Sequence, residues 1–540
     1  MDQPLSPLPR SLWLGLLLLW LLACALAMFG LGDLPLRDFD EATVARVSLE
    51  LSTKKGVEQL FPTLWTANYI NKPPGLHFLI AGLIRLTSDS IDQLENLPSE
   101  FVVRLVPALL SSLVVPFGGL IQWYLRPKEP LPSLATAGIL LTLLPIARHG
   151  RLAMLDGTQL SAMALLWLLF LSFDKSHWDK LRALFAGFVS SFLLLLKAPF
   201  LIPALIAAVI PIGLSQRTRK LSFVPLSGFY VIGLLPGILW HILHGFKRGS
   251  EALWLWGGDG ATRVLFSVGE GSDLGSLVPI LEILEGGWPW LMLWPFGIAW
   301  AWKERHTPWG QWSLISQLIL AMTILPLKTQ LPWYSHPLWL PFSLLCGMPF
   351  AWLVERQNNL NLPFKYFLAR VPYAFICLGL CMLSFGMCGF LKLIPSIAVY
   401  SQFALSAGTG WVVGGWLLTR SLRGQRFLGS VAVLLGSFVA LVLFMGSSFW
   451  LWELNETWPV RPVAQMISEA KASVVFIDGN HERPSLNWYA GQHVKRLDSF
   501  SNSGWILTRN STHFSKNHPQ NDCRLIQHGQ EWDLMFCKAN

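Results

Sequence analysis

Long apolar runs constrain the fold of this chain more than any other sequence feature. The first is Ser11–Gly30, which we interpret as a retained membrane anchor because further runs follow it. A run of roughly 15 to 25 apolar residues is long enough for a transmembrane helix, and about thirteen are present. The others are Phe101–Leu125, Leu131–Ala147, Gln159–Phe173, Leu181–Leu196, Phe200–Leu214, Phe223–His244, Trp288–Trp302, Gln311–Leu327, Tyr334–Val354, Val371–Leu391, Ile397–Thr419 and Phe427–Leu451. The sequence therefore predicts an all-α polytopic membrane domain.

The composition excludes the main soluble classes. Charged residues make up 14% of the 540 residues and hydrophobic residues 53%, whereas a soluble domain is about 25% charged. Such a chain is not a soluble enzyme, a disordered tail or a secreted disulfide scaffold. Its basic residues do not cluster with aromatic residues, so we expect no nucleic-acid partner.

One short apolar segment, Pro74–Leu86, decides the predicted topology. If it crosses the membrane, the basic group Arg217–Lys220 falls outside. If it lies along the membrane surface, all the basic connections share one face, which the positive-inside rule assigns to the cytoplasm. We therefore predict an interfacial helix, a cytoplasmic N-terminus and an extracytoplasmic C-terminus. The connections concerned include Arg126–Lys128, Lys175–Arg182, Lys303–Arg305, Arg356–Arg370 and Arg420–Arg426.

The larger connections then lie on the outer side. They are a first loop at about 32–100, a second at about 245–287 and a tail at 453–540. The chain divides into a membrane domain, 1–452, and a small C-terminal α/β domain, 453–540. Strands are predicted at Ser473–Ile477, Trp505–Thr508 and Trp532–Phe536. Cys523 and Cys537, the cysteines in a polar region, can form a disulfide in an oxidising compartment.

Three carboxylates stand close together just after the first apolar run: Asp38, Asp40 and Glu41. The segment Ala42–Leu51 predicts a helix, so Asp40 and Glu41 lie at its N-terminus. Either carboxylate can act as a general base or hold a cation. The same pattern also suits helix capping beside a solvated loop.

Basic and aromatic candidates follow at other outer ends. Lys72 precedes Pro73-Pro74, which fix the backbone and present the ammonium at headgroup depth. Lys328 and Tyr334 offer a cation and a phenol in a later turn.

A second acidic candidate, Asp156, follows Arg151 at the end of the third apolar run. Lys197-Ala198-Pro199 is a further basic turn on the same face, and Arg263 lies in the second loop. Each motif also suits a structural ion pair or a snorkelling lysine. Their joint placement favours binding of an anionic lipid headgroup next to acid-base groups.

The order of these motifs resembles the polyprenyl-phosphate-sugar-dependent glycosyltransferases of the GT-C class. The similarity is to families 39 and 83, the aminoarabinose transferases and protein-mannosyltransferase-like enzymes. It rests on Asp40-Glu41, Lys72-Pro73-Pro74, Asp156, Lys197-Ala198-Pro199 and the stretch from Lys328 to Tyr334. The tail stretch Pro484–Gly491 also resembles the outer domain of the aminoarabinose group.

The resemblance implies inverting transfer of a hexose or pentose at the outer face of a bacterial inner membrane. The donor would be a polyprenyl-phosphate sugar, and the acceptor a lipid, a glycan or a protein. Asp40 would be the principal catalytic carboxylate, with Glu41 beside it, and Asp156 a second functional acid. The donor phosphate would be held by Lys72, Arg263 and Tyr334, with Lys328 and Arg151 as further candidates.

Two residues depart from the aminoarabinose pattern, and they bear on the sugar and on phosphate binding. Asn71 stands where that group has Glu, and Thr43 where it has Arg. The missing carboxylate removes a partner for an amino sugar, so we expect a neutral sugar. Arg37 or Arg46 would have to replace the missing guanidinium.

Two other classes compete with the transferase interpretation. A lipid-linked-sugar transporter or flippase needs outer cations and a lipid groove, but predicts ionisable residues within the spans, and these are nearly absent. A polysaccharide polymerase or ligase is the second. No cofactor is firmly implied, although Asp40, Glu41 and Asp156 could support a divalent metal.

Overall fold

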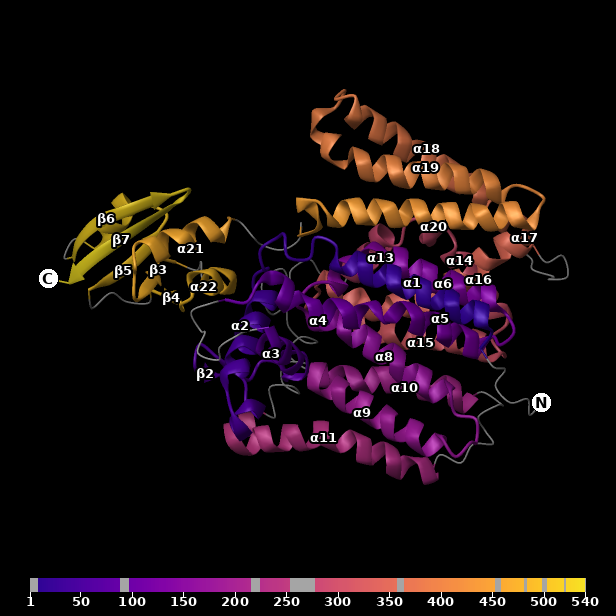
Figure 1. Ribbon diagram of the computed structural model, residues 1–540, viewed down its shortest axis with the longest axis horizontal. Helices are drawn as coiled ribbons and strands as arrows, with labels where there is room; N and C mark the ends of the chain where they lie inside the picture. The colour runs from indigo at the N-terminus through magenta and orange to yellow at the C-terminus, as the bar shows by residue number, and fades with distance from the viewer. Residues whose placement is uncertain are drawn as a thin grey trace. The chain divides into compact units, whose positions relative to one another are not determined.

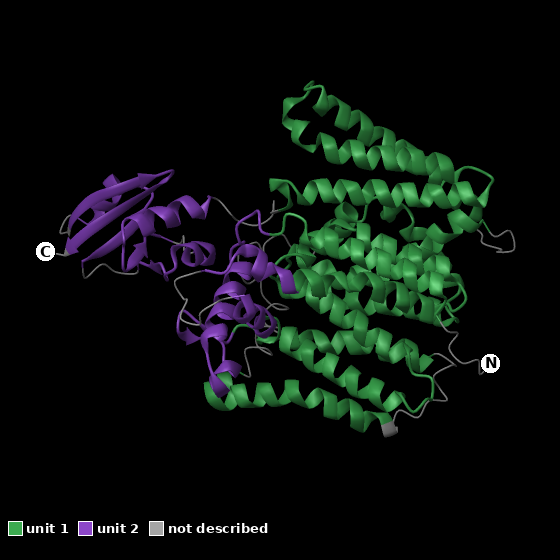
Figure 2. Ribbon diagram, viewed as in Figure 1, with its two compact units in different colours: residues 1–31, 71–76, 107–450 green, residues 32–70, 77–106, 451–540 purple. Residues whose placement is uncertain are grey.

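The computed structural model describes residues 8–87, 97–214, 224–252, 277–356, 364–451, 458–479, 483–497, 503–518 and 521–539. The chain forms two compact units (Figure 2). Unit 1 contains residues 1–31, 71–76 and 107–450, and unit 2 contains residues 32–70, 77–106 and 451–540. Unit 2 therefore includes the predicted first outer loop as well as the tail.

Unit 1 is helical. Its helices are α1 (Arg10–Met28), α5 (Val114–Leu125), α6 (Pro130–Thr142), α7 (Leu144–Gly150), α8 (Leu155–Leu171), α9 (Asp179–Lys197), α10 (Leu201–Leu214), α11 (Val224–Arg248), α13 (Val278–Gly286), α14 (Trp294–Lys303), α15 (Pro308–Ile324), α16 (Trp339–Glu355), α17 (Lys365–Leu368), α18 (Val371–Phe390), α19 (Ser401–Leu418) and α20 (Arg423–Met445). Each predicted apolar run coincides with one of these helices or with a consecutive pair, and α4 (Glu100–Ser112) extends from unit 2 into unit 1.

The number of membrane crossings stays a prediction. Among the described residues, seven helices are long and apolar enough to span a membrane, or up to eight if the pair α6 and α7, bent by 59°, counts as one. The predicted number is larger because it includes shorter helices, such as α15 with 17 residues. It also divides the continuous 36-residue run Asp179–Leu214, which exceeds the roughly 20 residues that one crossing needs.

Helix α16 forms the interior of unit 1, and α11 and α18 form parts of its surface. Every residue of α16 from Trp339 to Val354 is buried. In contrast, only 17% of the most apolar stretch of Leu226–Arg248 is buried, so leucines such as Leu239 remain exposed. Apolar side chains on such a surface are what contact with hydrocarbon requires.

Small residues allow the peripheral helices to approach closely. A Cβ atom at Gly187 of α9 would lie 2.1 Å from the Tyr230 carbonyl oxygen of α11, and one at Gly233 would lie equally close to the Leu184 carbonyl oxygen. Close backbone contact at small residues is the usual packing of helices in membranes, where no hydrophobic effect drives them together. Helices α18, α19 and α20 also lie side by side (Figure 1).

Unit 2 combines short helices with a sheet. Its first-loop elements are α2 (Asp40–Thr53), η1 (Gly56–Leu60), β1 (Thr63–Leu64), β2 (Ala67–Asn68) and α3 (Gly75–Thr87). Its tail elements are α21 (Val460–Glu469), β3 (Val475–Ile477), α22 (Pro484–Ala490), β4 (Lys495–Arg496), β5 (Gly504–Thr508), α23 (Ser511–Asn517), β6 (Asn521–Gly529) and β7 (Trp532–Ala539). The predicted helix at 42–51 and the three predicted tail strands are confirmed.

The tail sheet has the strand order β4-β3-β5-β7-β6. Strand β3 pairs in parallel with β4 and β5, and β7 pairs antiparallel with β5 and β6. The core packs Val475, Ile477, Leu507 and Leu534 against helix residues such as Ile467. This arrangement is the predicted α/β fold.

The segment Pro74–Leu86, predicted to be an interfacial helix, forms helix α3 in the structure. The helix is confirmed, and its interfacial position stays a prediction. Arg85, near its end, donates hydrogen bonds to the carbonyl oxygens of Leu51, Ser52 and Lys54. A cation at the C-terminal carbonyls of α2 satisfies groups that the helix leaves unpaired. The arginine that interrupts the apolar run therefore fastens α3 to α2.

Strands β6 and β7 are joined by a disulfide. Cys523 and Cys537 are directly opposite each other and form the bond.

We expect Cys523→Ser to destabilise the tail by about 2–4 kcal/mol, because an unlinked unfolded chain has more conformational entropy. Limited proteolysis of the full-length protein under oxidising conditions measures this as earlier cleavage within the tail. Cys377→Ser, at an exposed free cysteine of α18, should leave the cleavage pattern unchanged. Equal cleavage in the two variants would contradict the prediction.

Candidate functional site

Two of the three carboxylates around the start of α2 are held in buried contacts. Asp38 is 4% exposed and accepts hydrogen bonds from the backbone nitrogen of Ser485 at 2.9 Å and from its hydroxyl. It also forms an ion pair with Arg483. Because Ser485 lies in the first turn of α22, the carboxylate meets the positive end of that helix.

Glu41 forms the second buried contact. Its two carboxylate oxygens accept hydrogen bonds of 2.8 and 2.7 Å from Arg104, and both side chains are fully buried. Arg104 also donates to the carbonyl oxygens of Leu34 and Pro35, and Glu41 accepts from the backbone nitrogen of Arg37 at 3.0 Å. A bidentate pair of this kind fixes the geometry of the loop.

Asp40 differs from its two neighbours because its side chain is half-exposed. It begins α2, and the preceding residue, Phe39, has a φ of 56°. A positive φ is rare for a bulky residue, and such strain often occurs at functional sites. Of the three carboxylates, Asp40 is the one placed at the surface of unit 2.

The tail motif Pro484–Gly491 holds the same loop. It forms α22 and ends at Gly491, whose φ of 67° suits glycine. The Tyr489 hydroxyl accepts from the backbone nitrogen of Leu36 at 2.7 Å and donates to Glu100 at 2.8 Å. Burial, reinforced by the Glu100 carboxylate, raises the pKa of Tyr489, so the phenol keeps its donating proton.

A second cluster lies in unit 1 and joins three of the predicted motifs. The Lys197 ammonium is 3.5 Å from the Asp156 carboxylate and 4.5 Å from the centre of the Tyr334 ring. Asp156 lies in the first turn of α8 and Lys197 in the last turn of α9, which are the helix ends that favour their charges. The side chain of Lys197 remains 36% exposed, so its cation can meet a ligand.

The Lys72 motif packs against the end of α9. A Cβ atom at Gly75 would lie 2.7 Å from the carbonyl oxygen of Leu195, two residues before Lys197. Pro73 and Pro74 are buried, and Lys72 is half-exposed. The structure thus brings the segment that carries Lys72 to the end of the helix that carries Lys197.

The turn from Lys328 to Tyr334 is fixed by a buried amide. The Gln330 side chain donates to the carbonyl oxygens of Ile324 at 3.0 Å and Leu327 at 2.7 Å. Lys328 is exposed. Tyr334 lies in the first turn of the 3₁₀ helix η5 (Pro332–Leu338), and its ring contacts the Lys197 ammonium. No sequence signal singled out Gln330.

Arg151 makes contacts that the sequence did not indicate. It is fully buried, donates to the Phe29 carbonyl oxygen at the end of α1, and stacks on Trp450 at 4.3 Å. Its predicted phosphate contact stays a prediction.

Arg263 lies outside the described residues. In the described part of the chain, no group of three or more His, Cys, Asp and Glu residues gathers to hold a metal.

Sequence reasoning missed the roles of Arg104 and Lys197. Arg104 stands alone in an apolar run, and a buried charge of this kind needs a partner. That signal could have suggested an acid in the preceding loop, but not which one. The sequence places Lys197 in a basic turn, but gives no signal that this lysine links Asp156 to Tyr334.

Comparisons with known proteins agree with this architecture. No family model matches the chain. It is 24% identical over 438 residues, 75% of this chain and 72% of the relative, to the undecaprenyl phosphate-alpha-4-amino-4-deoxy-L-arabinose arabinosyl transferase of Yersinia pestis (strain Pestoides F). It superimposes on ArnT from Cupriavidus metallidurans bound to undecaprenyl phosphate with a TM-score of 0.70 at 14% identity, covering 98% of each chain.

The chain has the GT-C glycosyltransferase fold. The oligosaccharyltransferase of Archaeoglobus fulgidus is a more distant structural neighbour, with a TM-score of 0.51 at 9% identity, covering 90% of this chain and 65% of that one. The apolar helices and the bacterial relatives indicate a multi-pass protein of the bacterial inner membrane. The predicted fold class is confirmed.

The Glu41–Arg104 pair makes a stability prediction. Glu41→Ala leaves a buried guanidinium without its carboxylate and should destabilise the protein by about 3–5 kcal/mol. Glu531→Ala, which removes one member of the exposed pair at 3.9 Å from Arg509, should cost less than about 1 kcal/mol. Thermal unfolding in detergent compares the two. If Glu41→Ala unfolds at the wild-type temperature, the pair does not hold the loop.

Proposed function

We propose that this chain is an inverting glycosyltransferase of the inner membrane that uses a polyprenyl-phosphate sugar as its donor. The carrying observation is the Asp156–Lys197–Tyr334 cluster, which places a cation, a carboxylate and a phenol together at helix ends. The proposal is supported by the similarity of this chain, over 438 residues, to a transferase whose name contains an undecaprenyl-phosphate sugar. The acceptor is a lipid, a glycan or a protein.

The reaction takes place at the outer face of the membrane, with the N-terminus in the cytoplasm and the tail outside. This orientation rests on the positive-inside rule, because the basic connections all fall on the opposite side. The outer side then holds the first loop, the tail and the ends of α8 and α9 near Asp156 and Lys197.

In the reaction, the bond between the sugar C1 and the phosphate oxygen breaks, and a bond from C1 to the acceptor oxygen forms. The departing phosphate carries negative charge, which Lys197 and Lys72 stabilise as cations while Tyr334 donates a hydrogen bond. Arg263 joins them, as do Lys328 and Arg151 in a lesser role. Asp156 keeps the Lys197 ammonium in position through its 3.5 Å contact.

Asp40 takes the proton of a hydroxyl acceptor as a general base. Its half-exposed position at the start of α2 supports this role, whereas Asp38 and Glu41 are buried. We therefore assign Glu41 a positioning role for the loop that presents Asp40. The sugar is neutral, since Asn71 replaces the glutamate of the aminoarabinose pattern.

Asp40→Asn should abolish transfer while the protein still inserts and folds, because the amide cannot accept the proton. Mass spectrometry of lipid extracts should then show the polyprenyl-phosphate sugar accumulating, as in cells that lack the protein. Asp33→Asn changes an exposed acid of the same loop and should leave the lipid pool normal. Unchanged lipid levels with an altered sidedness of the lipid-linked sugar would instead favour a flippase.

Lys197→Gln should lower the transfer rate by about 10²–10³-fold, the usual cost of one electrostatic contact to a developing charge. Lys175→Gln, at an exposed lysine distant in sequence from every candidate motif, is the control. Both variants are assayed with the donor isolated from the Asp40→Asn cells. Equal rates for the two variants would exclude Lys197 from phosphate binding.

A further inference from the structure

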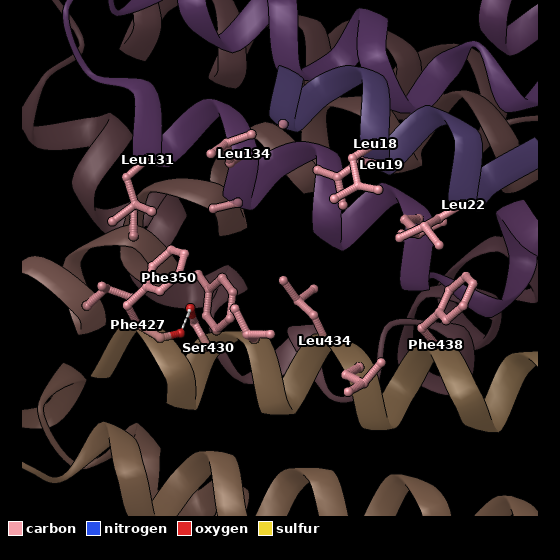
Figure 3. A pocket seen from close by; sticks show the side chains of 17 residues that line it. Leu18, Leu19, Leu22, Leu131, Leu134, Phe350, Phe427, Ser430, Leu434 and Phe438 are labelled. Atoms are coloured by element: carbon pink, nitrogen blue, oxygen red, sulfur yellow. Dashed lines mark hydrogen bonds between the residues drawn. The ribbon is translucent and has the colours of Figure 1, made fainter. Parts of the chain in front are cut away.

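An apolar cavity of about 290 Å³ lies between α1, α6, α16 and α20 in unit 1 (Figure 3). Leu18, Leu19 and Leu22 of α1 line one side, and Leu434 and Phe438 of α20 line another. The one hydroxyl among its lining residues, on Ser430, donates to the Phe427 carbonyl oxygen within α20. The lining therefore offers a ligand apolar surface and no available hydrogen-bond donor.

This cavity continues toward one end of the helices. A second cavity, of about 360 Å³, adjoins the first and has four lining residues in common with it: Leu131, Leu134, Val354 and Phe427. The second cavity is also lined by Ser11, Pro130, Glu355, Arg423 and Gly424, which lie at helix ends. The two together form a groove that is apolar along its length and polar at its mouth.

The groove has the depth of one lipid leaflet. Leu12 of α1 also lines the second cavity, and Leu22 lines the first. Between them α1 rises by about 15 Å at 1.5 Å per residue. The hydrocarbon core of a bilayer is about 30 Å thick, so the groove reaches about half of that distance. A single acyl chain matches this depth.

Basic groups predominate at the mouth of the groove. Arg423 is 70% exposed and lies 3.3 Å from Glu355, an acid at the mouth. Arg356 and Arg426 are held close by, through bonds to the carbonyl oxygens of Leu418 and Val354. Arg420 belongs to the same turn, because its carbonyl oxygen accepts from Arg426 at 3.2 Å. These four guanidinium groups outnumber the nearby carboxylates, Glu355 and Glu129, which interact electrostatically with each other. The excess positive charge suits an anion.

We propose that this groove binds an anionic glycerophospholipid, with one acyl chain between α1 and α20 and the phosphate against Arg423. Basic pockets between transmembrane helices on the cytoplasmic side are suited to anionic headgroups. The mouth lies among the connections predicted to be cytoplasmic, at the opposite helix ends from Asp156 and Lys197. The bound lipid is therefore separate from the donor site and acts as a structural ligand of the bundle.

Native mass spectrometry of the full-length protein tests the proposal, with phosphatidylglycerol and phosphatidylcholine of identical acyl chains as the probes. Phosphatidylglycerol should bind more tightly. Arg423→Ala should weaken its binding about fivefold, the effect of one basic residue at an anionic surface, and leave phosphatidylcholine unaffected. Arg305→Ala, at an exposed arginine outside the groove, should change neither.

The apolar part of the groove is tested separately. Leu434→Trp fills the groove and should weaken binding of both lipids, whereas Leu428→Trp, at a residue of α20 that is 59% exposed and outside the groove, should not. Equal binding of the two lipids by the wild-type protein would overturn the proposal, as would unchanged binding in Arg423→Ala. Displacement of phosphatidylglycerol by a polyprenyl phosphate would also overturn it, because the groove would then belong to the donor. Arg423→Ala decides the matter alone if Leu434→Trp does not insert.

Discussion

The pairing of charge at the ends of helices is the constraint on which this structure depends. Inside hydrocarbon a helix satisfies its own backbone, but its terminal groups remain unpaired. Polar chemistry is therefore concentrated at helix ends, where the macrodipole favours acids at N-termini and cations at C-termini. Asp40 begins α2, Asp156 lies in the first turn of α8, and Lys197 ends α9. Arg85 serves the end of α2 in the same way.

Buried ion pairs withdraw two of the three carboxylates that follow α1 from solvent. Asp38 and Glu41 are occupied by Arg483 and Arg104, and these contacts join the first loop to the tail and to α4 within unit 2. A buried carboxylate without such a partner would be strongly disfavoured. Asp40, between them in sequence, is held at the surface by its neighbours' contacts. The tail thus has a structural role in presenting the acid that the proposed reaction uses.

The two ends of the membrane bundle are specialised differently. One end carries the Asp156–Lys197–Tyr334 cluster and the Lys72 segment, and the other carries the arginines around the lipid-sized groove. In both proposals a cation meets an anionic lipid headgroup, and the depth of the groove limits its ligand to an acyl chain as long as one leaflet.

The helical membrane architecture, the α/β tail and the charged motifs can all be predicted from the amino-acid sequence, because apolar length and strand patterning are local properties. The sequence also indicated Lys72, Asp156 and Tyr334 as candidates. Three features emerge only when the chain is folded: Lys197 links Asp156 to Tyr334, Glu41 is buried against Arg104, and Arg151 contacts Trp450. These outcomes depend on contacts between residues tens to hundreds of positions apart, and the burial of a charge follows from its partner rather than from its neighbours in sequence.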